Sequence, residues 1–160
     1  MDPEGAKASV SQPDKFVVSV VYGKINNYDE LKSSYERVDE KLQSAQFELI
    51  GPCKKIGRQA GKIEFRYVHL NKTVTTEEAL AEIKKRGFRP AIDDELVSFT
   101  QQFPEEQKKF PIVALGSIWK NGHCDNCVAH KHGKDGKRAF ILARSDSVWL
   151  ESCRFLAVQR

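Results

Sequence analysis

The chain has 160 residues, which suits a single domain, and its 40% hydrophobic and 30% charged residues are ordinary for a globular protein. Basic and acidic residues are interleaved and the net charge is only +4, so binding to nucleic acid is not indicated. No stretch reaches membrane-spanning length, and residues 1–7 lack the apolar core of a signal peptide. We therefore expect a cytoplasmic protein whose four cysteines are reduced or hold a metal ion.

The N-terminal part predicts a short leader followed by a strand and a helix. Residues 1–14 have little to bury and are expected to be a disordered leader. The β-branched and aromatic run Lys15–Gly23 predicts a strand. From Tyr28 to Ala45, apolar residues recur at helical spacing, which predicts one amphipathic helix. Its apolar stripe consists of Leu31, Tyr35, Val38 and Leu42.

Two further strands complete a strand–helix–strand segment over residues 15–70. The run Phe47–Ile50 predicts a short strand that ends before Gly51-Pro52. From Gly61 to Leu70, apolar and charged residues alternate, which is typical of a half-exposed strand. The basic run Lys54–Arg58 between them is interpreted as solvated loop charge.

Helix signals follow in the next segment. Thr75 and Glu78 have the spacing of a capping box, and Gly87 predicts the end of that helix. A second helix is expected after Pro90, and Phe103-Pro104 should end it. Its first turn holds the acids Asp93, Asp94 and Glu95. The first two are its candidate caps, and we interpret all three as capping and helix-dipole residues, not as a catalytic pair.

The last part of the chain predicts a sheet. Phe110–Trp119 is the most apolar run and predicts a central strand, with the tail Cys153–Val158 as its pairing partner. Asp135-Gly136 between two extended runs predicts a hairpin, and Val148–Leu150 should finish the sheet. One more helical turn is expected between residues 104 and 109. We therefore expect one α+β domain over residues 15–160, with a mixed or antiparallel sheet and two to three helices.

A recognisable pattern runs through residues 75–158. It consists of Thr75–Leu80, Gly87–Ala91, Glu95-Leu96, Phe110–Trp119 and Arg154–Val158, with Phe-Pro-Ile-Val-Ala-Leu-Gly-Ser as its most specific phrase. This pattern resembles a family of uncharacterised small bacterial proteins that is common in candidate-phylum genomes. Arg89-Pro90-Ala91, Ile118-Trp119 and Cys153-Arg154-Phe155 also resemble C-type-lectin-like and formylglycine-generating-enzyme-like domains. That wider resemblance implies a C-type-lectin-like fold for residues 71–160.

Polar and aromatic residues gather on the predicted C-terminal hairpins, beyond the apolar core. Aromatic rings flanked by hydrogen-bonding groups suit the recognition of sugars or peptides. We therefore predict a non-catalytic binding module for a protein or carbohydrate partner. The expected contacts are Asn126, His130, Arg144 and Trp149. For Trp149, a place in the core is the alternative.

The alternative function is a zinc-binding or thiol-dependent enzyme. Its candidate ligands are Cys124, Cys127, His130 and His132. A Cys-x-x-Cys turn would bring two thiolates to one tetrahedral ion, and Cys53 or Cys153 could complete the shell with a histidine. A surface loop without metal is the other interpretation of the same residues. No catalytic constellation is otherwise indicated.

Overall fold

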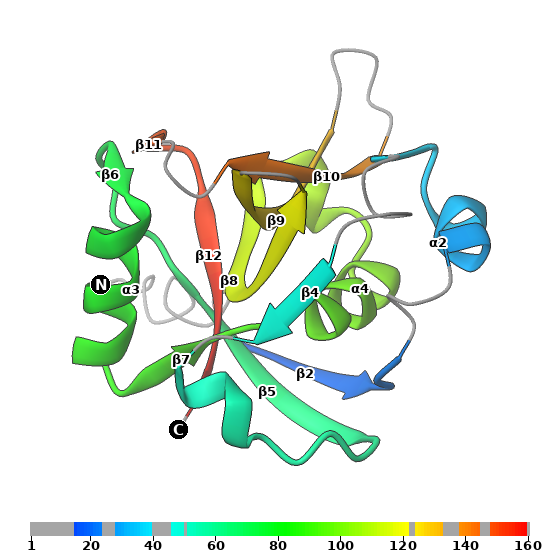
Figure 1. Ribbon diagram of the computed structural model, residues 1–160, viewed down its shortest axis with the longest axis horizontal. Helices are drawn as coiled ribbons and strands as arrows, with labels where there is room; N and C mark the ends of the chain where they lie inside the picture. Colours follow the sequence, from blue (N-terminus) through cyan, green and yellow to red (C-terminus); the bar gives the residue numbers. More distant parts are fainter. Residues whose placement is uncertain are drawn as a thin grey trace, which may run out of the picture.

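A computed structural model describes residues 15–23, 28–39, 46–49, 51–121, 124–132, 138–144 and 148–159 (Figure 1). Its elements are β2 (Lys15–Val20), α2 (Tyr28–Ser34), β3 (Arg37–Val38), β4 (Gln46–Leu49), the 3-10 helix η4 (Gly51–Lys55), β5 (Gly61–Val68), β6 (Val74–Thr75), α3 (Thr76–Lys85), β7 (Phe88–Pro90), α4 (Asp93–Gln102), the 3-10 helix η5 (Glu106–Lys108), β8 (Ile112–Asn121), β9 (Cys124–His132), β10 (Arg138–Arg144), β11 (Val148–Trp149) and β12 (Arg154–Gln159). The predicted α+β class is confirmed. The predicted leader, residues 1–14, lies outside the described residues.

Within the described residues, nine strands form one mixed sheet. Its order is β2-β5-β12-β8-β9-β10-β3, with β4 added to β8 and β7 added to β12. The tail strand β12 runs parallel to β8, with Arg154 opposite Ile112, so the predicted pairing of the tail with the central strand is confirmed. Strands β2 and β5 from residues 15–70 pair into the same sheet as the C-terminal strands.

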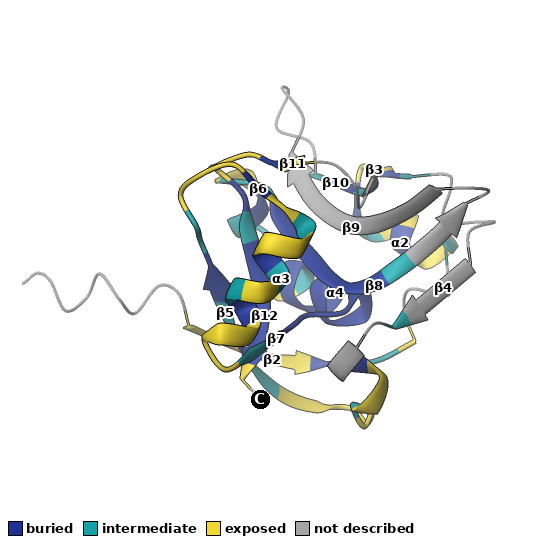
Figure 2. Cartoon of the chain, turned by 60° about the vertical axis from the view of Figure 1, so that its left-hand side comes forward, coloured by how far each residue is buried: buried dark blue, intermediate teal, exposed yellow. Residues whose placement is uncertain are grey.

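Helices α4 and α3 cover opposite faces of this sheet. Along β12, Leu156 and Val158 pack in the cluster that contains the apolar residues of α4. The alternate residues Phe155 and Ala157 pack in the cluster that contains Ala79 and other apolar residues of α3. Figure 2 shows α4 buried over most of its length, from Asp93 to Thr100, whereas α3 exposes one side. Successive side chains of β12 point to opposite faces of the sheet, and both faces are buried. The sheet therefore lies between two apolar cores.

The predicted start of α3 is confirmed in atomic detail. The hydroxyl of Thr75 accepts a hydrogen bond from the N–H of Glu78 (3.1 Å), and the carboxylate of Glu78 accepts one from the N–H of Thr75 (2.8 Å). These reciprocal bonds satisfy two amide donors that the first turn leaves without helical partners. Gly87 has φ = +85° at the end of the helix, a conformation that glycine adopts at little cost.

The first helix is shorter than the sequence predicted. Helix α2 ends at Ser34, and Arg37–Val38 then runs parallel to β10, so the expected helix from residue 28 to residue 45 is wrong over residues 35–39, and its remainder lies outside the described residues. Arg138 explains the change, because its guanidinium binds the carbonyl of Ser34 at 3.0 Å and lies 4.9 Å above the ring of Tyr35. Pairing with the backbone of β10 replaces further helical turns. Leu42 of the predicted stripe lies outside the described residues.

The two strands of the C-terminal hairpin pair as predicted, and the predicted turn at Asp135-Gly136 lies outside the described residues. The segment after the hairpin does not join the main sheet. Strands β9 and β10 pair antiparallel from Arg138 opposite His132 to Arg144 opposite Asn126. Strand β11 pairs with β6 in a separate two-stranded sheet, which corrects the expectation that Val148–Leu150 finishes the main sheet. The predicted helical turn after Pro104 is present as η5. None of the described helices is long and apolar enough to cross a membrane.

Candidate functional site

Three consecutive acids open helix α4, and all three are buried. Asp93, Asp94 and Glu95 are 0%, 2% and 0% exposed. The sequence interpretation as helix-start acids accounts for their position but not for this burial. Moving a carboxylate out of water costs several kcal/mol unless charged or hydrogen-bonding partners replace the water. That cost is comparable to the whole free energy of unfolding of a small domain. The partners of these acids therefore show what this region does.

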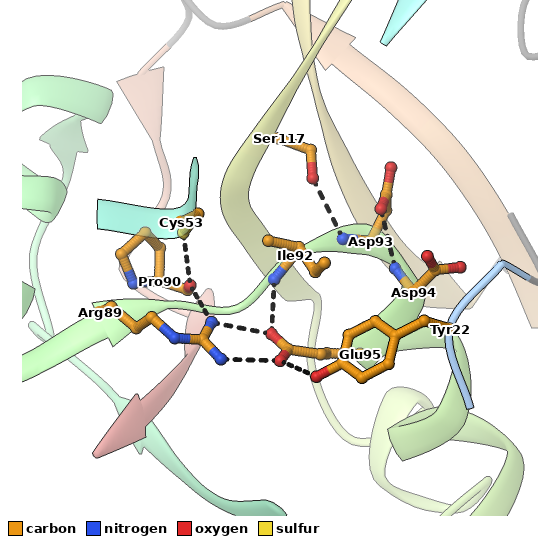
Figure 3. A network of polar contacts seen from close by, with 9 residues as sticks. All are labelled: Tyr22, Cys53, Arg89, Pro90, Ile92, Asp93, Asp94, Glu95 and Ser117. Carbon is orange, nitrogen blue, oxygen red and sulfur yellow. Dashed lines mark hydrogen bonds and ion pairs between the residues drawn. The ribbon is translucent and has the colours of Figure 1, made fainter. Parts of the chain in front are cut away.

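A buried ion pair joins α4 to β7 (Figure 3). The guanidinium of Arg89, which is 8% exposed, donates to both carboxylate oxygens of Glu95, at 3.0 and 2.8 Å. The same carboxylate accepts hydrogen bonds from the N–H of Ile92 at 2.9 Å and from the hydroxyl of Tyr22 at 2.8 Å. Arg89 also donates to the carbonyl of Pro90 at 3.1 Å. The charges are thus neutralised in a two-bond geometry that fixes both side chains.

Ile92, not Asp93 or Asp94, is the residue that precedes the first turn of α4. Its N–H binds the Glu95 carboxylate, which is half of a capping box, and its own side chain makes no capping bond. The predicted caps are therefore wrong. The Asp93 N–H instead binds the hydroxyl of Ser117 at 3.2 Å, and a carboxylate oxygen of Asp94 accepts from the N–H of Gly23 at 3.0 Å.

A bulge in β8 reaches the same helix start. Ala114 pairs with Val128 and Trp119 pairs with Asn126, so residues 115–118 of β8 stand opposite residue 127 alone. Within this bulge, the N–H of Gly116 donates to the carbonyl of Ala91 at 2.9 Å. Bulges of this kind re-aim a strand locally, and here the bulge turns β8 toward the residues that precede α4.

Cys53 of η4 closes the network from the other side. Its Sγ–H donates to the carbonyl of Pro90 at 3.3 Å. A Cβ at Gly116 would lie 2.7 Å from the Ala91 carbonyl oxygen and 2.9 Å from this sulfur, so only glycine fits there without a shift. Burial raises the pKa of the Cys53 thiol to about 11, although the nearby Arg89 lowers it. The thiol is therefore neutral at physiological pH and is not an activated nucleophile.

Tyr22 and Arg89 of the network also keep their protons at physiological pH. Burial, and then the charge of Glu95, raises the pKa of the Tyr22 phenol above its usual value. Burial lowers the pKa of Arg89, but the hydrogen bonds and charge of Glu95 outweigh it and raise the pKa overall. A general base or nucleophile needs a pKa near the working pH. Neither of these two groups meets that condition, and the hydrogen bonds of the network join the segment after β2, as well as β7, η4 and β8, to α4.

We predict a loss of stability in mild alkali. The folded state keeps the Cys53 thiol protonated up to a pKa of about 11, whereas the ordinary value is 9.0, so the stabilisation is complete below pH 9 and is lost as the pH rises toward 11. The expected loss is on the order of 2 kcal/mol in the free energy of unfolding. Urea unfolding at pH 8, 9.5 and 11 measures it. Cys53→Ala should make this slope shallower between pH 8 and 9.5, below the range in which Tyr22 contributes most, and an unchanged slope there would contradict the assignment.

The structure places Trp149 in the core. It is 6% exposed, its ring packs edge-on against Phe155 with centroids 6.2 Å apart, and its indole N–H donates to the hydroxyl of Thr76 at 2.9 Å. This position corrects the expectation that Trp149 contacts a ligand. Its neighbours Val148 and Leu150 are the exposed residues of this segment, at 57% and 65%.

The Cys-x-x-Cys segment belongs to strand β9, which corrects the expectation that it forms a turn. Residues three apart in a strand fall on opposite faces, with Cα atoms about 10 Å apart, so positions 124 and 127 do not share a face. His130 and His132 fall on the face of position 124. Among the residues whose side chains the structure describes, which leave out those of β9, no group of three or more His, Cys, Asp or Glu could hold a metal ion, and Cys53 and Cys153 are both buried. The zinc and thiol-enzyme hypothesis stays a prediction, without the turn that motivated it.

Strand register brings two of the predicted contact residues together. Asn126 on β9 stands directly opposite Arg144 on β10. His130 lies on the same face of β9, but its register partners are Ile112 and Phe140, both fully buried. Position 130 therefore belongs to a row of the core face, whereas Asn126 and Arg144 form a row nearer the end of the sheet. The side chains of these β9 and β10 residues lie outside what the structure describes.

Sequence reasoning missed the Arg89–Glu95 pair. One signal was available, because Arg89 is the only charged residue in the run Phe88–Ile92, and a lone charge in an apolar run needs a buried partner. No family model matches this chain, and neither a curated protein nor a solved structure matches it. The likeness to small bacterial proteins and to C-type-lectin-like domains therefore stays a prediction, and function has to be argued from the molecule itself.

Proposed function

We propose that the protein is a non-catalytic binding module whose ligand lies along one row of the main sheet. The row consists of Phe47 on β4, Trp119 on β8, Asn126 on β9 and Arg144 on β10, each directly opposite the next in the register. We call these four positions the cross-strand row. Directly opposed residues of antiparallel strands lie on one face, and three strand spacings make the row about 14 Å long.

The composition of the row supports recognition rather than chemistry. It combines two aromatic residues, an amide and a guanidinium. Aromatic rings stack on the apolar faces of sugars, while amides and guanidinium groups bind hydroxyls and carboxylates in fixed directions. This combination favours a carbohydrate ligand. A peptide is the alternative ligand, and the experiment must distinguish the two. The proposed function rests on the arrangement of these four residues in the cross-strand row.

The buried network around Arg89 and Glu95 helps to position the cross-strand row. Positions 117 and 119 share a face of β8, and the hydroxyl of Ser117 is bound by the first N–H of α4. The bulge that brings Ser117 and Gly116 to α4 therefore also sets where Trp119 meets Asn126. A binding site on rigid elements loses less entropy when its ligand binds. In this proposal, the Arg89–Glu95 pair has a positioning role and makes no contact with the ligand.

The test compares native protein with Asn126→Ala/Arg144→Ala on arrays of glycans and of peptides. We expect native protein to bind a defined class of ligand, and the double variant to bind it at least about tenfold more weakly, because a charged and a neutral hydrogen-bonding group are both lost. Lys131→Ala is the matched control, since position 131 lies on the other face of β9. Equal binding by the double variant, or no ligand on either array, would overturn the proposal.

A further inference from the structure

Helix α4 has a second set of contacts, along the edge of the sheet. Strand β2 is the last strand on its side of the described sheet. Gln102 accepts from the N–H of Ser19 at 3.2 Å and donates to its carbonyl at 2.6 Å. The hydroxyl of Ser98 accepts from the N–H of Val21 at 3.3 Å, and Asp94 accepts from the N–H of Gly23 at 3.0 Å. We call Asp94, Ser98 and Gln102 the α4 ladder.

The spacing of the ladder matches the spacing of the strand. Its residues are four apart on the helix, and the backbone groups that they bind are two apart on the chain. Four helical residues rise about 6 Å and two extended residues rise about 6.7 Å, so the contacts to Ser19 and Val21 stay in step, and the contact to Gly23 follows in the turn after the strand. In an edge strand, alternate residues direct their N–H and C=O groups away from the sheet. Ser19 is such an outward residue of β2, and the bonds to Val21 and Gly23 continue along the chain just past the end of the strand at Val20.

The sequence of β2 favours pairing with another strand, so hydrogen bonds from α4 that occupy this edge would be useful. Phe16–Val21 reads Phe-Val-Val-Ser-Val-Val, without charge or proline, and Val17 and Val21 are 55% and 46% exposed. A short segment of high β-propensity and low charge on a sheet edge is a template for pairing with another strand. Charged residues and proline, which usually block such edges, are absent between residues 16 and 21.

We propose that the α4 ladder occupies the β2 edge in place of a neighbouring strand, and so keeps β2 from pairing with β2 of a second copy of this chain. A second copy is the partner because two identical segments can pair antiparallel about a two-fold axis, which closes after two chains. The side chains of Ser98 and Gln102 thereby do for the edge what the backbone of an added strand would do. This inference concerns α4 and β2 and is independent of the cross-strand row.

The test removes the ladder without removing the helix. In Ser98→Ala/Gln102→Ala, we expect the Ser19 and Val21 amides to exchange with solvent at least about fivefold faster than in native protein. We also expect an increase in sedimentation coefficient with concentration that native protein does not show. Gln102→Ala alone changes an exposed side chain and should give the exchange effect at Ser19 even if the double variant were to unfold.

Two controls make the result specific to the edge. Gln101→Ala removes the same side-chain type at the adjacent position, where it donates to Ser34, and should leave the sedimentation coefficient unchanged. Adding Val17→Lys to the ladder variant should abolish its association, because a charge on the exposed strand opposes pairing with a second copy. The proposal is overturned if the ladder variants exchange and sediment as native protein does, or if their association survives Val17→Lys.

Discussion

Replacing Glu95 with alanine is expected to lower the free energy of unfolding by about 3–5 kcal/mol, the range found when one partner of a buried ion pair is removed. The substitution leaves Arg89 at 8% exposure without its carboxylate. It also removes the acceptor for the hydroxyl of Tyr22 and for the N–H of Ile92. Urea unfolding followed by circular dichroism measures the change.

Two controls separate the buried pair from charge in general. Glu82→Ala breaks the ion pair between Glu82 and Arg86 on the exposed side of α3, and we expect no comparable loss because water replaces the partner. Arg89→Met/Glu95→Leu removes both buried charges and should be more stable than Glu95→Ala, since no charge is left buried alone. If Glu95→Ala unfolds at the same urea concentration as Glu82→Ala, the pair does not hold α4 in place.

Gly116→Ala is expected to cost about 3 kcal/mol, from overpacking together with a weakened hydrogen bond. The added methyl would lie 2.7 Å from the carbonyl oxygen of Ala91 and 2.9 Å from the sulfur of Cys53. The first of these is a backbone atom, so relief requires β8 and the segment before α4 to separate. That movement stretches the bond from the Gly116 N–H to Ala91. Thermal and urea unfolding both report it.

Gly57→Ala is the matched control for this substitution. A Cβ at Gly57 has no neighbouring atom within 4 Å, so the same chemical change should leave stability nearly unaffected. Because the bulge also sets the position of Trp119, Gly116→Ala should weaken ligand binding as well, whereas Gly57→Ala should not. Equal stability of the two variants would show that β8 is not tightly packed against the start of α4.

Local pattern was enough for much of the fold. The β-branched run of β2, the alternation in β5 and the capping box of α3 depend on neighbouring residues, and each was predicted correctly. The long helix from residue 28 failed because its apolar stripe also fits another solution. Tyr35 binds Thr100 and Val38 pairs with Phe140, and both partners come from distant parts of the chain. The spacing of apolar residues within one segment gives no information about such distant contacts.

The candidate site was harder to predict because it depends on contacts between elements. Asp93, Asp94 and Glu95 have the pattern of exposed helix-start acids, and their burial follows from the β8 bulge and from Arg89. The row of Asn126 and Arg144 depends on the register of a hairpin, and a shift of one residue would place them on opposite faces. Trp149 lies between two exposed residues and alternates inward, which the strand period favours.

Zinc content decides between a binding row and a metal centre on β9. It should be measured on reduced, untagged protein, for the native chain and for Cys124→Ser/Cys127→Ser. Because positions 124 and 127 fall on opposite faces of one strand, the proposed binding module predicts no stoichiometric zinc in either protein. Near one zinc per native chain, lost in the variant, would contradict it and would make the cysteines and histidines of β9 the functional centre.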